Sequence, residues 1–341
     1  MRRVEEPGPG TGTHQSSATS EYARFGPWVD EVTCIDELPR LYRSYPIDFA
    51  TADLVLKVPR NIARRDATPD MDLYDHVVVL EHERLTVLSR VTGRPEPGDR
   101  LRAASDEAWH AYEVATAALA GVVAVRDVVN LLDASLTIHR ADGSHVSLRY
   151  NGSARAQVDR LVSRLRASLA VGAPGPAGRA LLTAVAARGV PRQQVDVGAT
   201  DLSLRSDYLA AARREPRLRA WAWHGRQVVQ PSGTGLRGVV RRVTHAVSPV
   251  TLHGAVVAGD ERVLEVFGRH DWLVRGSAPV HSSSRLVVPL AHLREVRVEP
   301  DPCYQGAERV ILLLDGGTVE VVVPAGSAAH ALVVAAAGAA R

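Results

Sequence analysis

Cysteine is almost absent from this sequence. Its 341 residues include two cysteines, Cys34 and Cys303, which lie far apart in the chain. Neither a CxxC pair nor a cysteine-based metal site can be built from two such residues. The scarcity of cysteine is typical of proteins that reside in a reducing compartment.

Long hydrophobic runs are missing too. The longest apolar run, residues 331–340, has about half of the ~20 residues that a membrane-spanning helix requires. Residues 1–6 carry charges of both signs, and a Pro/Gly tract follows them without the apolar core of a signal peptide. We therefore expect a soluble, cytoplasmic protein.

Aromatic residues are few, at 5% of the chain, whereas hydrophobic residues as a whole reach 45%. An apolar content of this size is ordinary for globular proteins and argues against a chain that is disordered throughout. The cores must therefore consist mainly of valine, leucine and alanine. A length of 341 residues suits two domains of roughly 100–150 residues each.

Lysine occurs once, as Lys57, so arginine carries nearly all the positive charge. Residues 205–245 hold nine arginines against two acidic residues, an excess that could bind nucleic acid or an anionic membrane surface. Because arginine replaces lysine throughout the chain, the cluster also has a simpler explanation in overall composition. The candidate anion-binding surface consists of Arg213, Arg214, Arg217, Arg219, Arg241 and Arg242.

The most informative stretch is a strand, a turn, a second strand and a helix within residues 122–169. Polar and apolar residues alternate from Ser135 to His139, and Asp142-Gly143 then gives a hairpin signal. Ser153 is placed as a helix N-cap after the second strand. Apolar residues then recur at helical spacing, namely Val158, Leu161, Val162, Leu165 and Leu169.

The same order returns near the end of the chain. Asp315-Gly316 matches Asp142-Gly143 at an offset of 173 residues, a strand follows it, and Ser327 is placed as the next N-cap. The matching apolar residues of this second copy are Val310, Val319, Val321, Val323, Leu332 and Val333. We therefore predict two copies of one unit, each with antiparallel strands that end in a single helix.

This order resembles that of the pleckstrin-homology-like (PH-like) superfold, over about residues 73–169 and 236–337. The resemblance implies an α+β fold of mainly antiparallel strands. It implies two PH-like sheets or barrels, each capped by a C-terminal helix, with a short helical linker between them. Domains of this kind are interaction modules that bind peptides, proteins or anionic lipid headgroups. Neither copy has the Lys/Arg-rich first hairpin loop that binds phosphoinositides, since the loops read Glu81-His82-Glu83-Arg84 and Ala258-Gly259-Asp260-Glu261.

Composition and the repeat together predict five parts. They are a disordered tail (1–20), an aromatic strap that packs on the first domain (21–72), PH-like domain 1 (73–170), a Pro/Gly-rich linker with short helices (171–235) and PH-like domain 2 (236–341).

An acidic loop gives the main indication of an enzyme. Its carboxylates could hold Ca²⁺ or Mg²⁺ in a metal-dependent enzyme, although the EF-hand order is absent and arginines lie close enough to neutralise them. His76 and His82 would share one face of a continuous strand, but a third zinc ligand is not evident. The loop carboxylates are Asp66, Asp70, Asp72 and Asp75.

The remaining motifs do not support a catalytic function. Residues 233–238 fit G-x-G-x-x-G, but no lysine follows Lys57, which excludes a kinase. The valines after this motif disfavour the helix that a dinucleotide site needs. His281 precedes three serines in what we expect to be a polar loop. We therefore expect a non-enzymatic interaction or scaffold protein that binds a protein or peptide partner and needs no cofactor.

Overall fold

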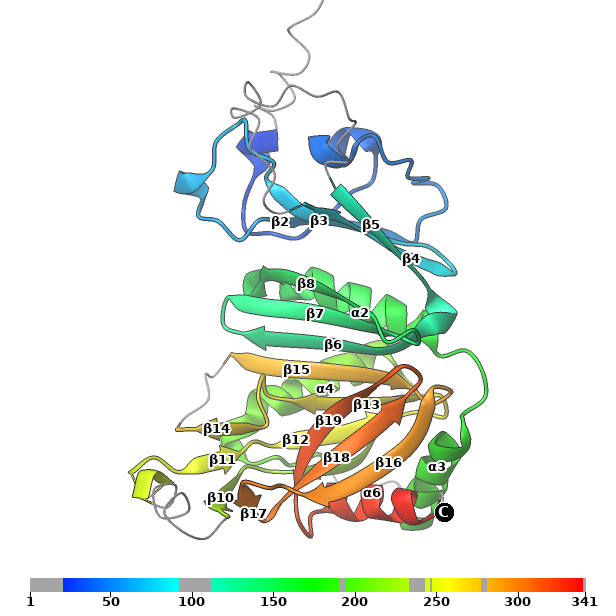
Figure 1. Ribbon diagram of the computed structural model, residues 1–341, viewed down its shortest axis with the longest axis vertical. Helices are drawn as coiled ribbons and strands as arrows, with labels where there is room; N and C mark the ends of the chain where they lie inside the picture. Colours follow the sequence, from blue (N-terminus) through cyan, green and yellow to red (C-terminus); the bar gives the residue numbers. More distant parts are fainter. Residues whose placement is uncertain are drawn as a thin grey trace, which may run out of the picture. The chain divides into compact units, whose positions relative to one another are not determined.

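The computed structural model describes residues 21–91, 112–189, 194–232, 243–245, 247–276 and 281–339. The chain divides into two compact units, residues 1–116 and 117–341, and each is described by itself. Within the described residues the fold is α+β, with mostly antiparallel strands, open sheets and few helices (Figure 1). The sheets form no closed barrel, so the barrel form of our expectation is wrong.

The first unit is a five-stranded sheet in the order β1-β2-β3-β4-β5. One of its faces is covered by the aromatic segment before β2, where Phe25 and Tyr42 pack with Val55, Val77 and Leu88. The Tyr42 hydroxyl donates to the carbonyl of Asp75 at 2.7 Å. The strands are β1 (Asp30–Glu31), β2 (Leu54–Pro59), β3 (Tyr74–Leu80), β4 (Arg84–Arg90) and β5 (Tyr112–Ala118).

The second unit is built around a seven-stranded sheet in the order β8-β7-β6-β15-β13-β12-β9. In Figure 1, β8, β7, β6, β15, β13 and β12 follow one another in that order. They are β6 (Val122–Asn130), β7 (Asp133–Arg140), β8 (His145–Asn151), β9 (Arg219–His224), β12 (Ala255–Gly259), β13 (Val263–Gly268) and β15 (Ser282–Pro289).

Two smaller sheets complete the second unit. The first has the order β16-β18-β19, with β16 (Leu293–Pro300), β18 (Ala307–Leu314) and β19 (Gly317–Pro324). The second has the order β14-β11-β10-β17, with β10 (Gln227–Pro231), β11 (Val250–Leu252), β14 (Leu273–Arg275) and β17 (Tyr304–Gln305).

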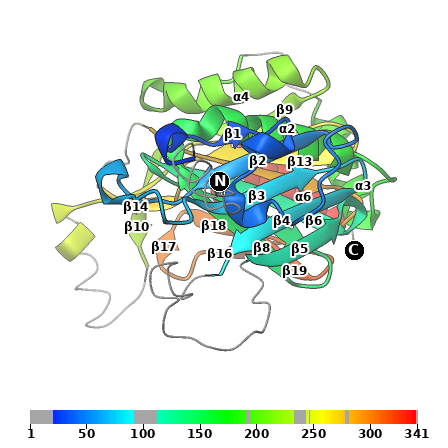
Figure 2. The same cartoon turned by 90° about the horizontal axis from the view of Figure 1, so that it is seen from above.

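Four helices flank these sheets: α2 (Arg155–Leu169), α3 (Pro176–Arg188), α4 (Leu202–Arg214) and α6 (Ala328–Ala339). The positions of α3 and α4 agree with the two short helices expected between the repeats. Figure 2 shows α4 and α2 on one side of the second unit.

The seven-stranded sheet is buried on both faces at β12, β13 and β15. On one face, Val257, Val266 and Leu286 share a hydrophobic cluster with β16, β18, β19, α3 and α6, to which Leu332 belongs. On the other face, Val256 and Phe267 pack with residues of α4. Neighbouring residues therefore point to opposite sides, as the pleat of a strand requires.

The β6–β15 pairing joins strands of both predicted PH-like domains in one sheet, whereas the Asp315-Gly316 hairpin lies in the β16-β18-β19 sheet. Asp127 of β6 is the register partner of Arg285 of β15, and β6 carries on through β7 and β8. The expected boundaries at residues 73–170 and 236–341 therefore differ from those of the structure, which divides the chain between residues 116 and 117. The expected linker also contains β9, a strand of this sheet. An edge-to-edge pairing of this kind depends on the tertiary fold, and no local pattern signals it.

Both hairpins of the repeat form as predicted. Gly143 and Gly316 adopt positive φ, the conformation that favours glycine in such turns. Ser327 is a true N-cap, since its hydroxyl accepts from the N–H of His330 at 3.1 Å. The expectation for Ser153 is wrong, because it lies in a 3-10 turn whose cap is the side chain of Asn151.

Candidate functional site

A groove of ≈ 740 Å³ lies between β16 and α6. Six successive residues of β16, from Arg294 to Glu299, border it. The helix contributes residues at spacings of four, three and one, which lie on one face of a helix. These residues are His330, Val334, Ala337 and Gly338.

Apolar side chains form part of the groove wall, and charged residues of β16 together with Glu308 and His330 form the rest. Val296 is buried, Val298 is half-buried, and Val334 is 44% exposed. The main chain of β16 pairs with β18 along one edge, and the described strands place no neighbour along its other edge. An edge strand beside a groove is an arrangement that accepts an added strand.

Charges of both signs surround the groove. The Arg294 guanidinium donates two hydrogen bonds to Asp315, which hold the pKa of that carboxyl below its usual range. Arg297 pairs with Glu295 at 2.7 Å, and Arg309 pairs with Glu299 at 3.2 Å. This surface therefore favours no single sign of charge in a ligand.

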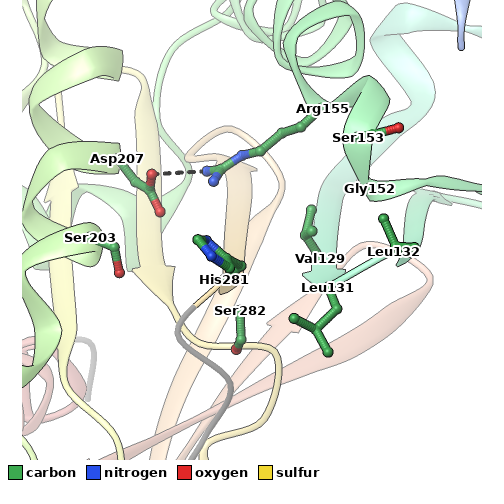
Figure 3. Close-up of a pocket in the computed structure, with 10 residues that line it drawn as sticks. All are labelled: Val129, Leu131, Leu132, Gly152, Ser153, Arg155, Ser203, Asp207, His281 and Ser282. Atoms are coloured by element: carbon green, nitrogen blue, oxygen red, sulfur yellow. Dashed lines mark ion pairs between the residues drawn. The ribbon is translucent and has the colours of Figure 1, made fainter.

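A second pocket, of ≈ 360 Å³, lies at the start of α2 (Figure 3). Leu131 and Leu132 of the β6–β7 turn lie on one side, and Asp207 of α4 lies on the other. Arg155 reaches across to Asp207, with 3.1 Å between its Nη2 and the carboxylate. The remaining lining residues are Val129, Gly152, Ser153, Ser203, His281 and Ser282.

The leucine turn of this pocket has an unusual backbone. Leu131 has φ of 57°, the only positive φ of a non-glycine residue among those described. Gly152 fits tightly beneath it, because a Cβ on Gly152 would lie 2.1 Å from the Leu131 carbonyl oxygen. The Gly152 N–H donates to the carbonyl of Leu132 at 3.0 Å. Both leucines are more than half exposed.

The acidic loop is held by ion pairs in the structure. Arg90 contacts Asp75 at 2.9 Å, and Arg40 lies 3.5 Å from Asp72. The His76 ring hydrogen-bonds the Ser89 hydroxyl at 2.9 Å. Burial lowers the pKa of His76, which keeps the ring neutral. Across the described ranges, no three His, Cys, Asp or Glu side chains converge in a way that could hold a metal ion.

The arginines of the candidate anion-binding surface spread over the end of α4 and the segment that follows. Arg213, Arg214, Arg217 and Arg219 are all exposed. Arg214 lies 3.9 Å from Asp159, and Arg219 donates to the carbonyl of Pro216 at 2.7 Å. Arg241 and Arg242 lie outside the described residues, as does the G-x-G-x-x-G segment at 233–238.

The serines after His281 do not form the expected loop. Ser282, Ser283 and Ser284 are buried in β15. The Ser282 hydroxyl contacts the ring of His270 at 2.7 Å, and the Ser284 hydroxyl donates to the carbonyl of Arg269 at 2.8 Å. These contacts fasten the start of β15 to the end of β13.

A buried ionic network beneath α2 was missed by the sequence reasoning. Glu265 of β13 is fully buried and accepts hydrogen bonds from Arg166 and Arg285. Arg166 also reaches Asp260 at 2.6 Å and Glu215 at 3.2 Å. One signal was available in the sequence, because Glu265 interrupts the otherwise apolar strand Val263–Gly268.

No protein-family model, curated protein sequence or solved structure matches this chain. None of the helices in the described residues has the length and apolar character that crossing a bilayer requires.

Proposed function

We propose that the protein is a non-enzymatic interaction module that binds an extended peptide segment of a partner protein in the groove between β16 and α6. The observation that carries the proposal is the row of six successive β16 residues along the groove, on a strand at the edge of its sheet. A peptide added beside β16 gains main-chain hydrogen bonds along its whole length.

The groove also suggests what such a peptide looks like. In an extended peptide, every second side chain points the same way, so alternate residues would face the wall formed by Val298, Val334 and Ala337. The walls combine apolar side chains with charges of both signs. We therefore expect a segment of alternating apolar residues, with no strong net charge.

The resemblance to PH-like domains supports this proposal. The second stretch of the resemblance, about residues 236–337, holds the strands β11 to β19 and then the helix α6. A series of strands that ends in one helix is the order that the resemblance implies for a protein–protein interaction module. Fold alone does not assign function, so the proposal depends on the groove.

Selection of linear peptides from a random display library tests the proposal. We expect the selected peptides to lose about tenfold or more in affinity for Val334→Glu, because a charge on the groove wall opposes apolar contact. Ala335→Glu is the matched control, since Ala335 is exposed on the same helix and does not line the groove. A bound peptide should also slow hydrogen exchange in β16. Full affinity for Val334→Glu, or unchanged exchange in β16, would refute the proposal.

A further inference from the structure

A third pocket, of ≈ 340 Å³, lies between α2 and α4. It opens over the face of the seven-stranded sheet that carries Phe267, opposite the face that packs on β16 and α6. Alanines of both helices form its walls. The other residues around it are Arg155, Asp159, Asp207, Arg214, Phe267, Ser284 and Arg285.

Arg285 lines this pocket, and one nitrogen of its guanidinium group makes no hydrogen bond among the described residues. Arg285 as a whole is 6% exposed. Its Nε donates to Glu265 at 2.8 Å and its Nη1 to the Ser163 hydroxyl at 3.3 Å, and the guanidinium lies 5.6 Å from the centre of the Phe267 ring. Nη2 is buried and has no hydrogen-bond partner among the described residues. A buried, charged N–H group is costly to leave without an acceptor.

The other two arginines are incompletely engaged. Arg155 contacts Asp207 through Nη2 at 3.1 Å, whereas its buried Nε lies 3.8 Å from Asp159 and makes no hydrogen bond. Arg214 also stays 3.9 Å from Asp159, beyond hydrogen-bond distance, and its side chain is 45% exposed. Three guanidinium groups thus face one pocket that supplies two carboxylates.

We propose that this pocket binds the oxyanion group, phosphate or carboxylate, of a small molecule. The buried Nη2 of Arg285 donates to the anion, and Arg155 and Arg214 add charge-assisted hydrogen bonds from the two helices. The organic part of the molecule lies against Phe267 and the alanine walls. The site is independent of the peptide groove, because the two lie on opposite faces of the sheet.

Inorganic phosphate and acetate serve as probes, in calorimetric titrations at constant ionic strength on the full chain. We expect one or both to bind, and Arg214→Gln to weaken that binding by roughly threefold to tenfold. Arg213→Gln is the matched control, since Arg213 is exposed on the same helix and does not line the pocket. Its affinity should equal that of the wild type.

A pocket-filling variant separates the site from weak binding elsewhere. Ala210→Leu places a larger side chain on the α4 wall without changing any charge. It should abolish the titration signal while the chain keeps a cooperative unfolding transition. Binding of phosphate alone assigns a phosphate ligand, and binding of acetate alone assigns a carboxylate ligand. Absence of binding by both probes, or equal binding by wild type and Ala210→Leu, would overturn the proposal.

Discussion

Gly143 and Gly316, the two turn glycines of the sequence repeat, lie against each other in the structure. A Cβ on Gly143 would lie 3.2 Å from the carbonyl oxygen of Gly316, and a Cβ on Gly316 would lie 2.7 Å from the backbone nitrogen of Gly143. The repeat therefore brings its equivalent hairpins into contact. Glycine is needed here both for its positive φ and for this close approach.

The substitution Gly316→Ala should lower the free energy of unfolding by about 1–3 kcal/mol, since φ is +79° and the new Cβ would lie 2.2 Å from the Ala141 carbonyl oxygen. Urea denaturation measures the change. Gly317→Ala is the control, because a Cβ there meets nothing within 4 Å. Its effect should stay within about 0.5 kcal/mol. Equal effects of the two substitutions would contradict the contact.

Leu332→Ala should destabilise the whole second unit. Leu332 is fully buried in the cluster that also holds Val123 and Ala124 of β6. The free energy of unfolding should fall by about 2–5 kcal/mol, as is typical when a core leucine is replaced by alanine. The rate of hydrogen exchange should rise in β6 to β8 together with β16, β18 and β19, because one hydrophobic core lies between the seven-stranded and the three-stranded sheet.

Val334→Ala is the control for Leu332→Ala, since Val334 is 44% exposed. It should change the stability by less than about 0.5 kcal/mol. If Leu332→Ala raised exchange in β16 to β19 and left β6 to β8 unaffected, the two repeats would be separate cores.

His253 should make stability fall in acid. Burial lowers its pKa to about 4, with Arg226 and Arg269 acting in the same direction and Asp201 in the opposite one. The unfolded chain therefore binds more protons between about pH 6.5 and about pH 4, and stability is lost as the pH falls through this window. When the pH is lowered from about 7 to about 5, the free energy of unfolding of His253→Gln should fall by about 2 kcal/mol less than that of the wild type. Urea denaturation at the two pH values measures this difference.

His145→Gln is the control for this pH dependence, since His145 is exposed. Asp127 acts in the opposite sense, because burial raises the pKa of its carboxyl to about 6 and stability is then lost as the pH rises. Comparison of each variant with the wild type cancels that contribution. Identical pH profiles for wild type and His253→Gln would show that His253 does not titrate differently on folding.

Leu131→Gly should stabilise the β6–β7 turn. Leu131 is 53% exposed and has a positive φ, so its side chain is buried little and its backbone is strained. We expect a gain of about 0.5–1 kcal/mol in the free energy of unfolding. Leu132→Gly lacks this benefit and should be neutral or destabilising, because only Leu131 has the positive φ. A loss of stability in Leu131→Gly would show that side-chain packing outweighs strain.

Much of the local structure follows from the sequence alone. The hairpins at Asp142-Gly143 and Asp315-Gly316 and the N-cap Ser327 form where turn chemistry places them, and the helices α3 and α4 lie within the stretch 171–235 for which short helices were expected. These features depend on residues within a few positions of one another, so they can be predicted without the fold.

The remaining features depend on the tertiary structure, because strands and charged side chains pair with residues that lie far away in the sequence. The pairing of β6 with β15 joins strands of the two predicted domains in one sheet, and no local pattern predicts it. The same holds for Glu265, whose partners Arg166 and Arg285 come from another helix and strand. The α2–α4 pocket and the β16–α6 groove likewise form only when the helices pack on the sheets. The sequence by itself thus determined the elements and their repetition, and the packing of those elements determined where ligands can bind.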